Sequence, residues 1–283
     1  MPTDEVPLEI RRKLRWLPHL PYHTPLGRRG LAVITLLGGL FQFRGDARIK
    51  AWWVHHGNKG CKVYQPVDKR TDAVMLWIHG GGYIGLAASL DDKFCRRVVE
   101  ELGITLVSAE YRLAPKHRFP AGLDDCQESW QWMLDHAAEL GCDPNRSIIA
   151  GESAGGGLAA ALAQRIHDQG GTQPLAQMLV APMLDDRTAL REDLTHERHY
   201  IWNNQNNHGG WAAYMGQEPG QAEVPHYSVP ARRSSLKDLP PAWIGIGTAD
   251  LFLDESVEYA NRLKEAGVDC ELVLAKGGVH AFH

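Results

Sequence analysis

The sequence contains few cysteines, and none of them form a C-x-x-C pair. Five are scattered among 283 residues: Cys61, Cys95, Cys126, Cys142 and Cys270. An odd number of widely spaced cysteines argues against the disulfide framework that small secreted domains carry. We therefore expect reduced thiols in a cytoplasmic protein.

A surplus of positive charge is absent as well. The chain has 30 Lys and Arg against 34 Asp and Glu, which gives a net charge of -4. Such a chain has no bulk attraction to nucleic acid or anionic lipid. Its apolar fraction of 44% is typical of a soluble globular protein. We expect no nucleic-acid partner and no stable membrane anchor.

The sequence also lacks an apolar run long enough to cross a bilayer. The run from Leu31 to Leu40 follows Arg28 and Arg29, but ten residues are too few to span the membrane. It starts too late for a standard signal peptide, and no small-residue cleavage site follows it cleanly. We expect a helix that packs on the body of the protein. A twin-arginine export signal is the alternative.

Apolar segments of strand length alternate with helical segments from residue 48 onward. Strands are expected at 49–54, 61–64, 73–78, 104–109, 147–150, 176–180, 242–246 and 270–274. Helices are expected at 8–17, 31–43, 91–102, 122–140, 154–168 and 255–266. This alternation indicates βαβ units and a mostly parallel sheet, to which a hairpin of the first two strands adds an antiparallel edge.

Two regions break the alternation. Residues 1–45 carry five prolines, which limit helices to short pieces, and form an N-terminal arm. Residues 186–238 are rich in Asn, His, Trp and Pro and are too long for a plain loop. We expect this insertion to lie over the C-terminal edge of the sheet, where open α/β sheets bind ligands.

A G-x-S-x-G pattern stands between an expected strand and an expected helix. It reads Gly151-Glu152-Ser153-Ala154-Gly155. Strand, sharp turn and helix form the context of a nucleophile elbow, which holds a serine hydroxyl exposed at its tip. The small residues Gly151, Ala154 and Gly155 suit a turn in which a bulky side chain would collide with the backbone. The pattern predicts that Ser153 is a nucleophile.

A run of three glycines follows the strand expected at 73–78. It reads His79-Gly80-Gly81-Gly82. Glycine leaves its N–H group unshielded, and this motif completes the oxyanion hole of lipases and esterases. We predict that the N–H groups of Gly81, Gly82 and Ala154 bind an oxyanion. A phosphate cradle is the alternative, but the sequence has no P-loop and no G-x-G-x-x-G that opens a helix here.

A nucleophilic serine needs a histidine base and a carboxylate that orients it. In α/β-hydrolases the chain order is Ser, acid, His. Asp250 stands just past the strand expected at 242–246, and His280 lies in the loop after the last strand. Asp254 is the alternative acid, but it suits the N-terminus of the following helix. His283 is the terminal residue, so we predict Asp250 and His280 as the partners.

Other polar clusters fit structural roles better. The run His-Glu-Arg-His at 196–199 lacks the second histidine of H-E-x-x-H, because position 200 is Tyr200. We therefore predict no metal site. The carboxylate pairs at 124–125 and 185–186 are expected to form ion pairs or helix caps.

Aromatic residues supply the candidate substrate pocket. Tyr83 follows the glycine run, and the insertion contains Trp202 and Trp211 together with Tyr214. These side chains could surround an acyl group. Packing of the insertion on the body of the protein is the alternative for the two tryptophans and the tyrosine.

With these motifs, the chain resembles the hormone-sensitive-lipase family of α/β-hydrolases, in its bacterial esterase branch, over roughly residues 47–283. Beyond the two glycine motifs, the resemblance rests on four segments: Tyr111-Arg112-Leu113-Ala114-Pro115 with His117, Phe119-Pro120, Pro182-Met183-Leu184-Asp185-Asp186-Arg187 and Gly247-Thr248-Ala249-Asp250.

The resemblance implies an α/β-hydrolase fold with a mostly parallel central sheet of about eight strands, an antiparallel edge, helices on both faces and a cap. The cap would combine the arm, residues 1–45, with the insertion at about 186–238 of a catalytic domain at 46–283. The resemblance also implies a small-molecule ester substrate, no cofactor and a homodimer.

The chain departs from the family pattern at three places. Glu110 stands where the family usually has Asp, and Lys116 stands where an acid is common. Neither change touches the triad, but the family's local salt bridges are not expected to carry over at these positions. The chain stops three residues after His280, where the family continues into a final helix. Either the sequence is trimmed there or the protein lacks that helix, which would expose the histidine loop and leave sheet surface uncovered.

Motifs and resemblance together predict a serine carboxylesterase that hydrolyses short- to medium-chain esters through an acyl-enzyme. An amidase or peptidase with the same triad and a long-chain lipase are the alternatives. A non-catalytic small-molecule receptor is disfavoured, because the chain keeps all three residues of the triad.

Overall fold

The computed structural model describes residues 6–14, 21–40, 42–195 and 199–282. Most of the histidine run at 196–199 and the terminal His283 lie outside the described residues. Within these ranges, none of the helices combines the length and the apolar character that crossing a membrane requires.

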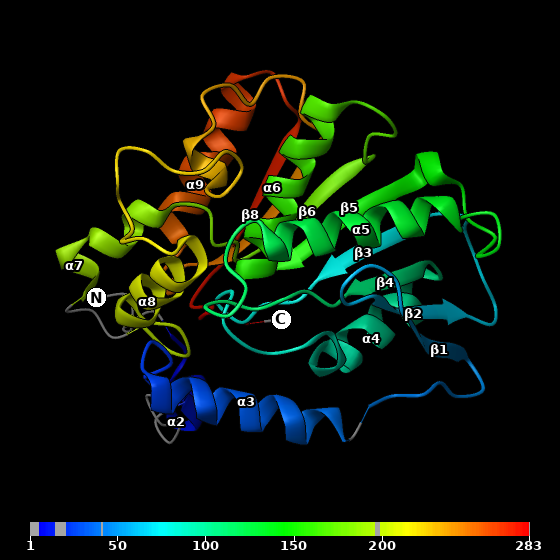
Figure 1. Ribbon diagram of the computed structural model, residues 1–283, viewed down its shortest axis with the longest axis horizontal. Coiled ribbons are helices and arrows are strands. Elements are labelled where there is room, and N and C mark those ends of the chain that lie inside the picture. Colours follow the sequence, from blue (N-terminus) through cyan, green and yellow to red (C-terminus); the bar gives the residue numbers. More distant parts are fainter. Residues whose placement is uncertain (1–5, 15–20, 41, 196–198, 283) are drawn as a thin grey trace.

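Among the described residues, one sheet of eight strands forms the centre of the molecule (Figure 1). The strand order is β1-β2-β4-β3-β5-β6-β7-β8. β2 runs antiparallel to both β1 and β4, and all the remaining neighbours are parallel, so the predicted fold is confirmed. The strands are Ile49–Val54 (β1), Cys61–Pro66 (β2), Val74–Ile78 (β3), Thr105–Ala109 (β4), Ser147–Glu152 (β5), Ala176–Val180 (β6), Ala242–Gly247 (β7) and Cys270–Ala275 (β8).

Helices cover both faces of this sheet. The α-helices are Leu8–Leu14 (α2), Pro25–Gly39 (α3), Asp92–Leu102 (α4), Ala121–Asp135 (α5), Ala154–Gln169 (α6), Glu192–Thr195 (α7), Asn204–Met215 (α8) and Leu253–Glu265 (α9). Short 3-10 helices lie at Ala88–Asp91 (η1), Pro144–Arg146 (η2), Asp186–Leu190 (η3) and Pro230–Arg232 (η4).

The strand β3 shows why a nearly continuous apolar segment fits the middle of this sheet. All five of its residues are buried. Leu76 belongs to the core on the face that α5 and α6 cover, whereas Trp77 packs on the opposite face with Cys95 of α4. Successive strand residues point to opposite faces, and here both faces are covered by helices.

The helix expected at 31–43 begins and ends earlier than predicted. α3 starts at Pro25 because Thr24 caps it: the Oγ1 atom of Thr24 accepts from the N–H of Gly27 at 3.1 Å, and proline is favoured at the first helical position. The residues at 27–30 are glycines and arginines, so they lack the apolar pattern from which the helix was predicted, and its first turns were missed. The helix expected at 122–140 also ends earlier, at Asp135, and turns follow it.

The insertion between β6 and β7 contains η3, α7, α8 and η4. It meets the N-terminal arm through side chains: the N–H of His23 donates to Asn206 of α8 at 3.2 Å, and the rings of Tyr22 and Trp202 stack with centroids 6.3 Å apart. The division into a cap and a catalytic domain stays a prediction.

Candidate active site

Ser153 occupies a strained turn between β5 and α6. Its backbone angles are φ 55° and ψ -121°, a conformation that costs free energy outside glycine. The turn is held by its own backbone, because the Ser153 N–H donates to Val180 at 2.9 Å and the Ser153 carbonyl accepts from Met183 at 2.9 Å. A Cβ atom on Gly155 would lie 2.1 Å from the Ile78 carbonyl oxygen, so the motif needs glycine there.

The structure brings the three predicted partners into one hydrogen-bonded chain. The Nε2 atom of His280 lies 2.9 Å from the Oγ atom of Ser153. Its Nδ1 atom lies 2.9 Å from the Oδ2 atom of Asp250. The other carboxylate oxygen of Asp250 accepts from the N–H of Phe252 at 2.9 Å, which fixes the carboxylate. This geometry is that of a nucleophile, a base and an orienting acid.

The loops that carry the acid and the base are bonded to each other. The N–H of Ala249 donates to the Gly278 carbonyl at 3.0 Å, and the N–H of Gly277 donates to the Thr248 hydroxyl at 2.9 Å. A Cβ atom on Gly247 would lie 2.2 Å from the Gly278 oxygen. These contacts set the separation of Asp250 and His280 through the backbone.

The exposure expected of the histidine loop holds for Ala281 and Phe282 but not for His280 itself. His280 is only 5% exposed, because the acid loop and the edge of the Phe252 ring, 5.3 Å away between centroids, cover it. Part of the sheet is uncovered, since Leu274 of the edge strand β8 is 50% exposed.

The environment of His280 favours its protonated form. Burial lowers the pKa of the imidazole, but the charge and hydrogen bond of Asp250 raise it above its ordinary value of 6.5, and Glu152 adds to the rise when its carboxyl group is ionised. An imidazole with a raised pKa is a stronger base toward the serine proton.

The glycine run forms a loop that borders the site beside Ser153. Gly81 and Gly82 have φ angles of 117° and 59°, which glycine adopts without strain. Tyr111 holds the first residue of this loop: its hydroxyl donates to the His79 carbonyl at 3.0 Å, and its ring stacks on that of His79. The N–H group of Ala154, at the first residue of α6, has no partner within the helix, as at any helix start.

A cavity of about 150 Å³ opens in front of Ser153. Its lining is mainly apolar and comes from the arm, the glycine loop, the elbow, the insertion and the histidine loop: Tyr22, Leu31, Gly80, Gly81, Gly82, Leu86, Glu152, Ser153, Ile201, Trp202, His280 and Ala281. Of the aromatic residues predicted to line a pocket, Trp202 lies in this lining.

Tyr83 and Trp211 do not belong to the lining of this cavity. Both rings are buried and pack on each other, with centroids 5.3 Å apart. The Tyr83 hydroxyl donates to the Met183 carbonyl at 3.2 Å, and its ring stacks on Tyr214. These residues join the insertion to the body, which is the packing role that the sequence left open for Trp211 and Tyr214.

Tyr22 and Leu31 line the cavity, although no motif in the sequence indicates a role for them. They come from the arm, more than 100 residues before Ser153. Glu152 also lines the cavity, and burial raises its pKa to about 8, with Asp91 adding to the effect, His280 opposing it and Asp250 adding a smaller part. In the sequence, the only indication that Glu152 belongs to the site is its position next to Ser153 in the G-x-S-x-G motif.

The other candidate carboxylates take structural roles, as predicted. Asp125 is buried and paired with Arg112 at 2.8 Å, and Asp186 is buried and paired with Arg232 at 2.7 Å. Asp254, the alternative acid, is exposed and paired with Arg191.

The structure also shows where the two departing side chains, Glu110 and Lys116, lie. Glu110 accepts from the N–H of Ala88 at 2.9 Å and lies 3.9 Å from the amine of Lys59, and Lys116 is exposed. Among the described residues, no group of three or more His, Cys, Asp or Glu is arranged to hold a metal ion, and the five cysteines are free and buried.

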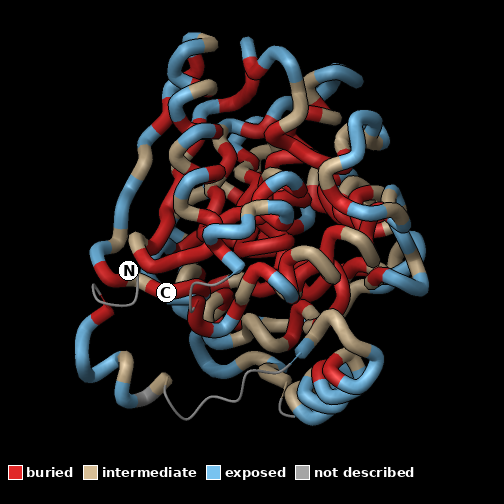
Figure 2. The backbone as a smooth tube through the Cα atoms, turned by 90° about the vertical axis from the view of Figure 1, so that its left-hand side faces the viewer, coloured by how far each residue is buried: buried red, intermediate tan, exposed pale blue. Residues whose placement is uncertain are grey.

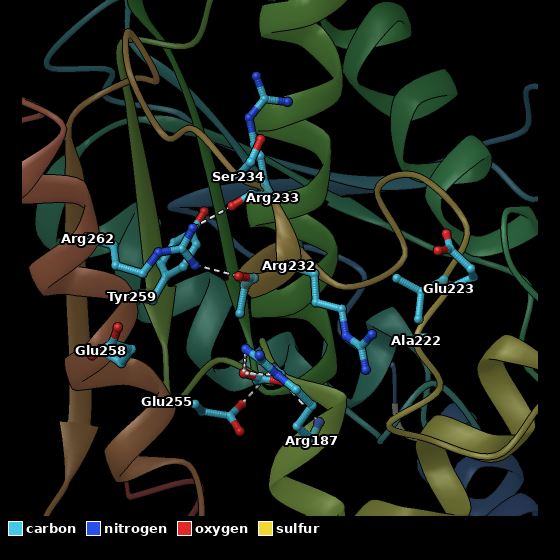
Figure 3. A pocket seen from close by; sticks show the side chains of 13 residues that line it. Arg187, Ala222, Glu223, Arg232, Arg233, Ser234, Glu255, Glu258, Tyr259 and Arg262 are labelled. Carbon is cyan, nitrogen blue, oxygen red and sulfur yellow. Dashed lines mark hydrogen bonds and ion pairs between the residues drawn. The ribbon is translucent and has the colours of Figure 1, made fainter.

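A second hollow, of about 630 Å³, lies beside α9 and η4 (Figure 3). Arginine side chains dominate it, but they are bound within the protein: Arg232 to Asp186, Arg233 to Asp168, and Arg262 to the carbonyls of Ala231 and Arg233. Neither Ser153 nor His280 lines it. The smaller cavity is therefore the candidate active site, because Ser153 and its hydrogen-bonded partner His280 line it.

Comparisons with known proteins agree with this architecture. A family model described as the alpha/beta hydrolase fold matches residues 75–283. The chain is 30% identical over 279 residues to the esterase LipI of Mycobacterium tuberculosis, which covers 96% of this chain and 80% of that protein. It is 33% identical over 226 residues to the carboxylesterase NlhH of the same species, which covers 78% of this chain and 70% of that one.

Solved structures are similar over almost the whole chain. A structure titled "Bacterial Heroin Esterase" aligns with a TM-score of 0.88 at 31% identity and covers 99% of this chain and 92% of its own. Esterase LipW from Mycobacterium marinum aligns with a TM-score of 0.81 at 30% identity and covers 99% and 89%. The chain therefore belongs to the hormone-sensitive-lipase family of α/β-hydrolases.

Proposed function

We propose that this protein is a serine carboxylesterase that hydrolyses small carboxylic esters through an acyl-enzyme on Ser153. The observation that carries the proposal is the hydrogen-bonded chain from Asp250 through His280 to Ser153, which ends at a cavity walled by the glycine loop. The names of the relatives, esterase and carboxylesterase, support ester hydrolysis as the reaction.

In the first half of the reaction, the Oγ atom of Ser153 attacks the ester carbonyl while the Nε2 atom of His280 takes its proton. Asp250 accepts a hydrogen bond from Nδ1–H and stabilises the imidazolium. The carbonyl oxygen becomes negative, and the N–H groups of Gly81, Gly82 and Ala154 bind it. Removal of one such donor typically costs about 3 kcal/mol of transition-state stabilisation.

In the second half, the imidazolium of His280 gives its proton to the departing alcohol, which leaves an acyl group on Ser153. A water molecule then enters, His280 removes a proton from it, and the resulting attack releases the acid and restores the serine. The apolar walls of the cavity limit access of bulk water and strengthen the electrostatic interactions inside.

The size of the cavity supports small substrates. A volume of about 150 Å³ is that of a cavity which holds a benzene-sized molecule. An acetyl to butyryl group fits such a space, whereas a fatty acyl chain would extend beyond it. We therefore favour short acyl esters over the long chains of a lipase.

The proposal is tested with the purified protein and p-nitrophenyl esters of increasing acyl length, alongside the matched anilide. The wild type should show a burst of p-nitrophenol, a preference for short esters and little anilide turnover. Ser153→Ala should lose the burst and about 10⁶-fold in kcat. A fluorophosphonate probe should label the wild type once and the variant not at all. A normal burst in Ser153→Ala would contradict the assignment.

A further inference from the structure

The helix α3 has two different faces. Its inner face consists of small and apolar residues at helical spacing, Gly27, Leu31, Thr35 and Gly38. Leu31 is buried against Gly85, where an added Cβ atom would meet its side chain at 2.0 Å. This face therefore packs closely on the segment that follows the glycine loop.

The outer face of α3 is apolar and exposed. Leu26, Val33 and Leu37 share one row of the helix, at spacings of seven and four residues, and Leu36 forms a neighbouring row with Leu40, the residue that caps the helix at its C-terminus. These side chains and Ile34 are between 43% and 76% exposed. α3 runs along one outer border of the molecule in Figure 1, and Figure 2 shows much of the tube in this region as exposed. A soluble monomer rarely exposes so many adjacent large apolar side chains.

The charge of the arm is opposite in sign to that of the whole protein. Residues 1–45 contain seven Lys and Arg against three Asp and Glu, whereas the chain as a whole has a net charge of -4. The helix α3 itself carries Arg28 and Arg29 and no acidic residue. Arg29 is exposed at the N-terminal end of the same face. An apolar helix face flanked by basic residues is the pattern of helices that lie in the interface of an anionic membrane.

We propose that the outer face of α3 docks on an anionic phospholipid surface. The helix lies in the plane of the interface with its leucines among the acyl chains and its basic residues near the headgroups. Because Leu31 on the inner face lines the cavity at Ser153, docking brings this cavity within about one helix diameter, 10 Å, of the lipid. The binding itself does not depend on the proposed ester hydrolysis.

The test is flotation of the full chain with two kinds of vesicle, phosphatidylcholine alone and phosphatidylcholine mixed with phosphatidylglycerol. The wild type should bind the anionic vesicles more strongly, and added salt should weaken this binding. The double variant Leu36→Ser/Leu37→Ser should lose at least about tenfold in partitioning, because binding scales with the apolar area buried. Arg29→Gln should lose about fivefold on anionic vesicles alone.

A matched control is Leu102→Ser/Leu175→Ser, which removes two leucines that are 53% and 54% exposed elsewhere on the surface. It should float as the wild type does, and thermal unfolding should show that all variants are folded. The proposal is wrong if the wild type does not bind anionic vesicles or if the α3 variant binds equally well. It is also wrong if sedimentation shows a dimer that Leu36→Ser/Leu37→Ser dissociates, because a second copy then covers this face.

Discussion

The carboxyl group of Glu152 and the imidazole of His280 border the same cavity, and each shifts the pKa of the other. Burial is the largest cause that raises the pKa of Glu152, to about 8, while His280 opposes the rise. At neutral pH the carboxyl group is therefore mostly protonated. Of the two acidic groups, Asp250 and Glu152, only Asp250 is then negatively charged. The site therefore carries one negative charge less while the oxyanion forms.

Replacement of Glu152 should change the alkaline side of the pH profile. A pKa of about 8 means that the carboxyl group keeps its proton until the pH passes that value, and its negative charge then appears beside the oxyanion. We expect kcat/KM of the wild type to fall above pH 8, and we expect Glu152→Gln to remove this fall. The exposed Glu139→Gln is the control and should retain it. Identical alkaline limbs in Glu152→Gln and the wild type would refute the role of this ionisation.

Replacement of Asp250 should change both the rate and the acid limb. His280 acts as a base only when it is neutral, so activity is lost as the pH falls through its pKa, which Asp250 holds above the ordinary 6.5. Asp250→Asn should lower kcat by about 10⁴-fold and move the acid limb of kcat/KM to lower pH. The control is Asp254→Asn, which changes the exposed alternative acid. It should keep the wild-type kcat and the wild-type acid limb of kcat/KM. A larger loss in Asp254→Asn would reverse the assignment of the acid.

The sheet and the Ser153–His280–Asp250 cluster could be predicted because each depends on local signals. Apolar segments of strand length marked the strands, and each of the three residues follows a strand end within a short motif. The carboxyl ends of parallel strands meet at one edge of a sheet, so chain order was enough to place them together.

The walls of the cavity could not be predicted in the same way. Tyr22 and Leu31 reach the cavity from the arm, and no periodicity in the sequence indicates which distant loop a side chain will meet. Trp202 and Trp211 both stand in the insertion and both are buried, yet only Trp202 lines the cavity. The difference arises from how the insertion packs, which depends on contacts between segments far apart in the chain.

Trp202 should limit the length of the acyl chain. Its ring fills the space beside Gly82, where an added Cβ atom would come within 2.1 Å of it. Trp202→Ala should enlarge the cavity and raise the ratio of kcat/KM for hexanoate over acetate by roughly tenfold or more, since each methylene contributes about 1–3 kcal/mol in an apolar pocket. The buried Trp211→Phe should leave the ratio unchanged, although it lowers stability. A constant ratio in Trp202→Ala would show that the acyl group binds elsewhere.

The ion pair of Arg112 and Asp125 should contribute strongly to stability when one partner is removed. Asp125 is 1% exposed, accepts from the Arg112 N–H at 2.7 Å and is held by its guanidinium at 2.8 Å. Asp125→Ala leaves the guanidinium without its carboxylate and should cost about 3–5 kcal/mol of unfolding free energy in urea.

The surface pair of Arg97 and Glu101 is the matched comparison, because both side chains are more than half exposed. Arg97→Ala should cost less than about 1 kcal/mol. Asp125→Asn should fall between Asp125→Ala and the wild type, because the amide oxygen still accepts from the Arg112 N–H while the charge is gone. Since Arg112 follows Tyr111, which steadies the glycine loop, the Asp125 variants should also lose activity. Equal costs for Asp125→Ala and Arg97→Ala would show that burial adds nothing to the first pair.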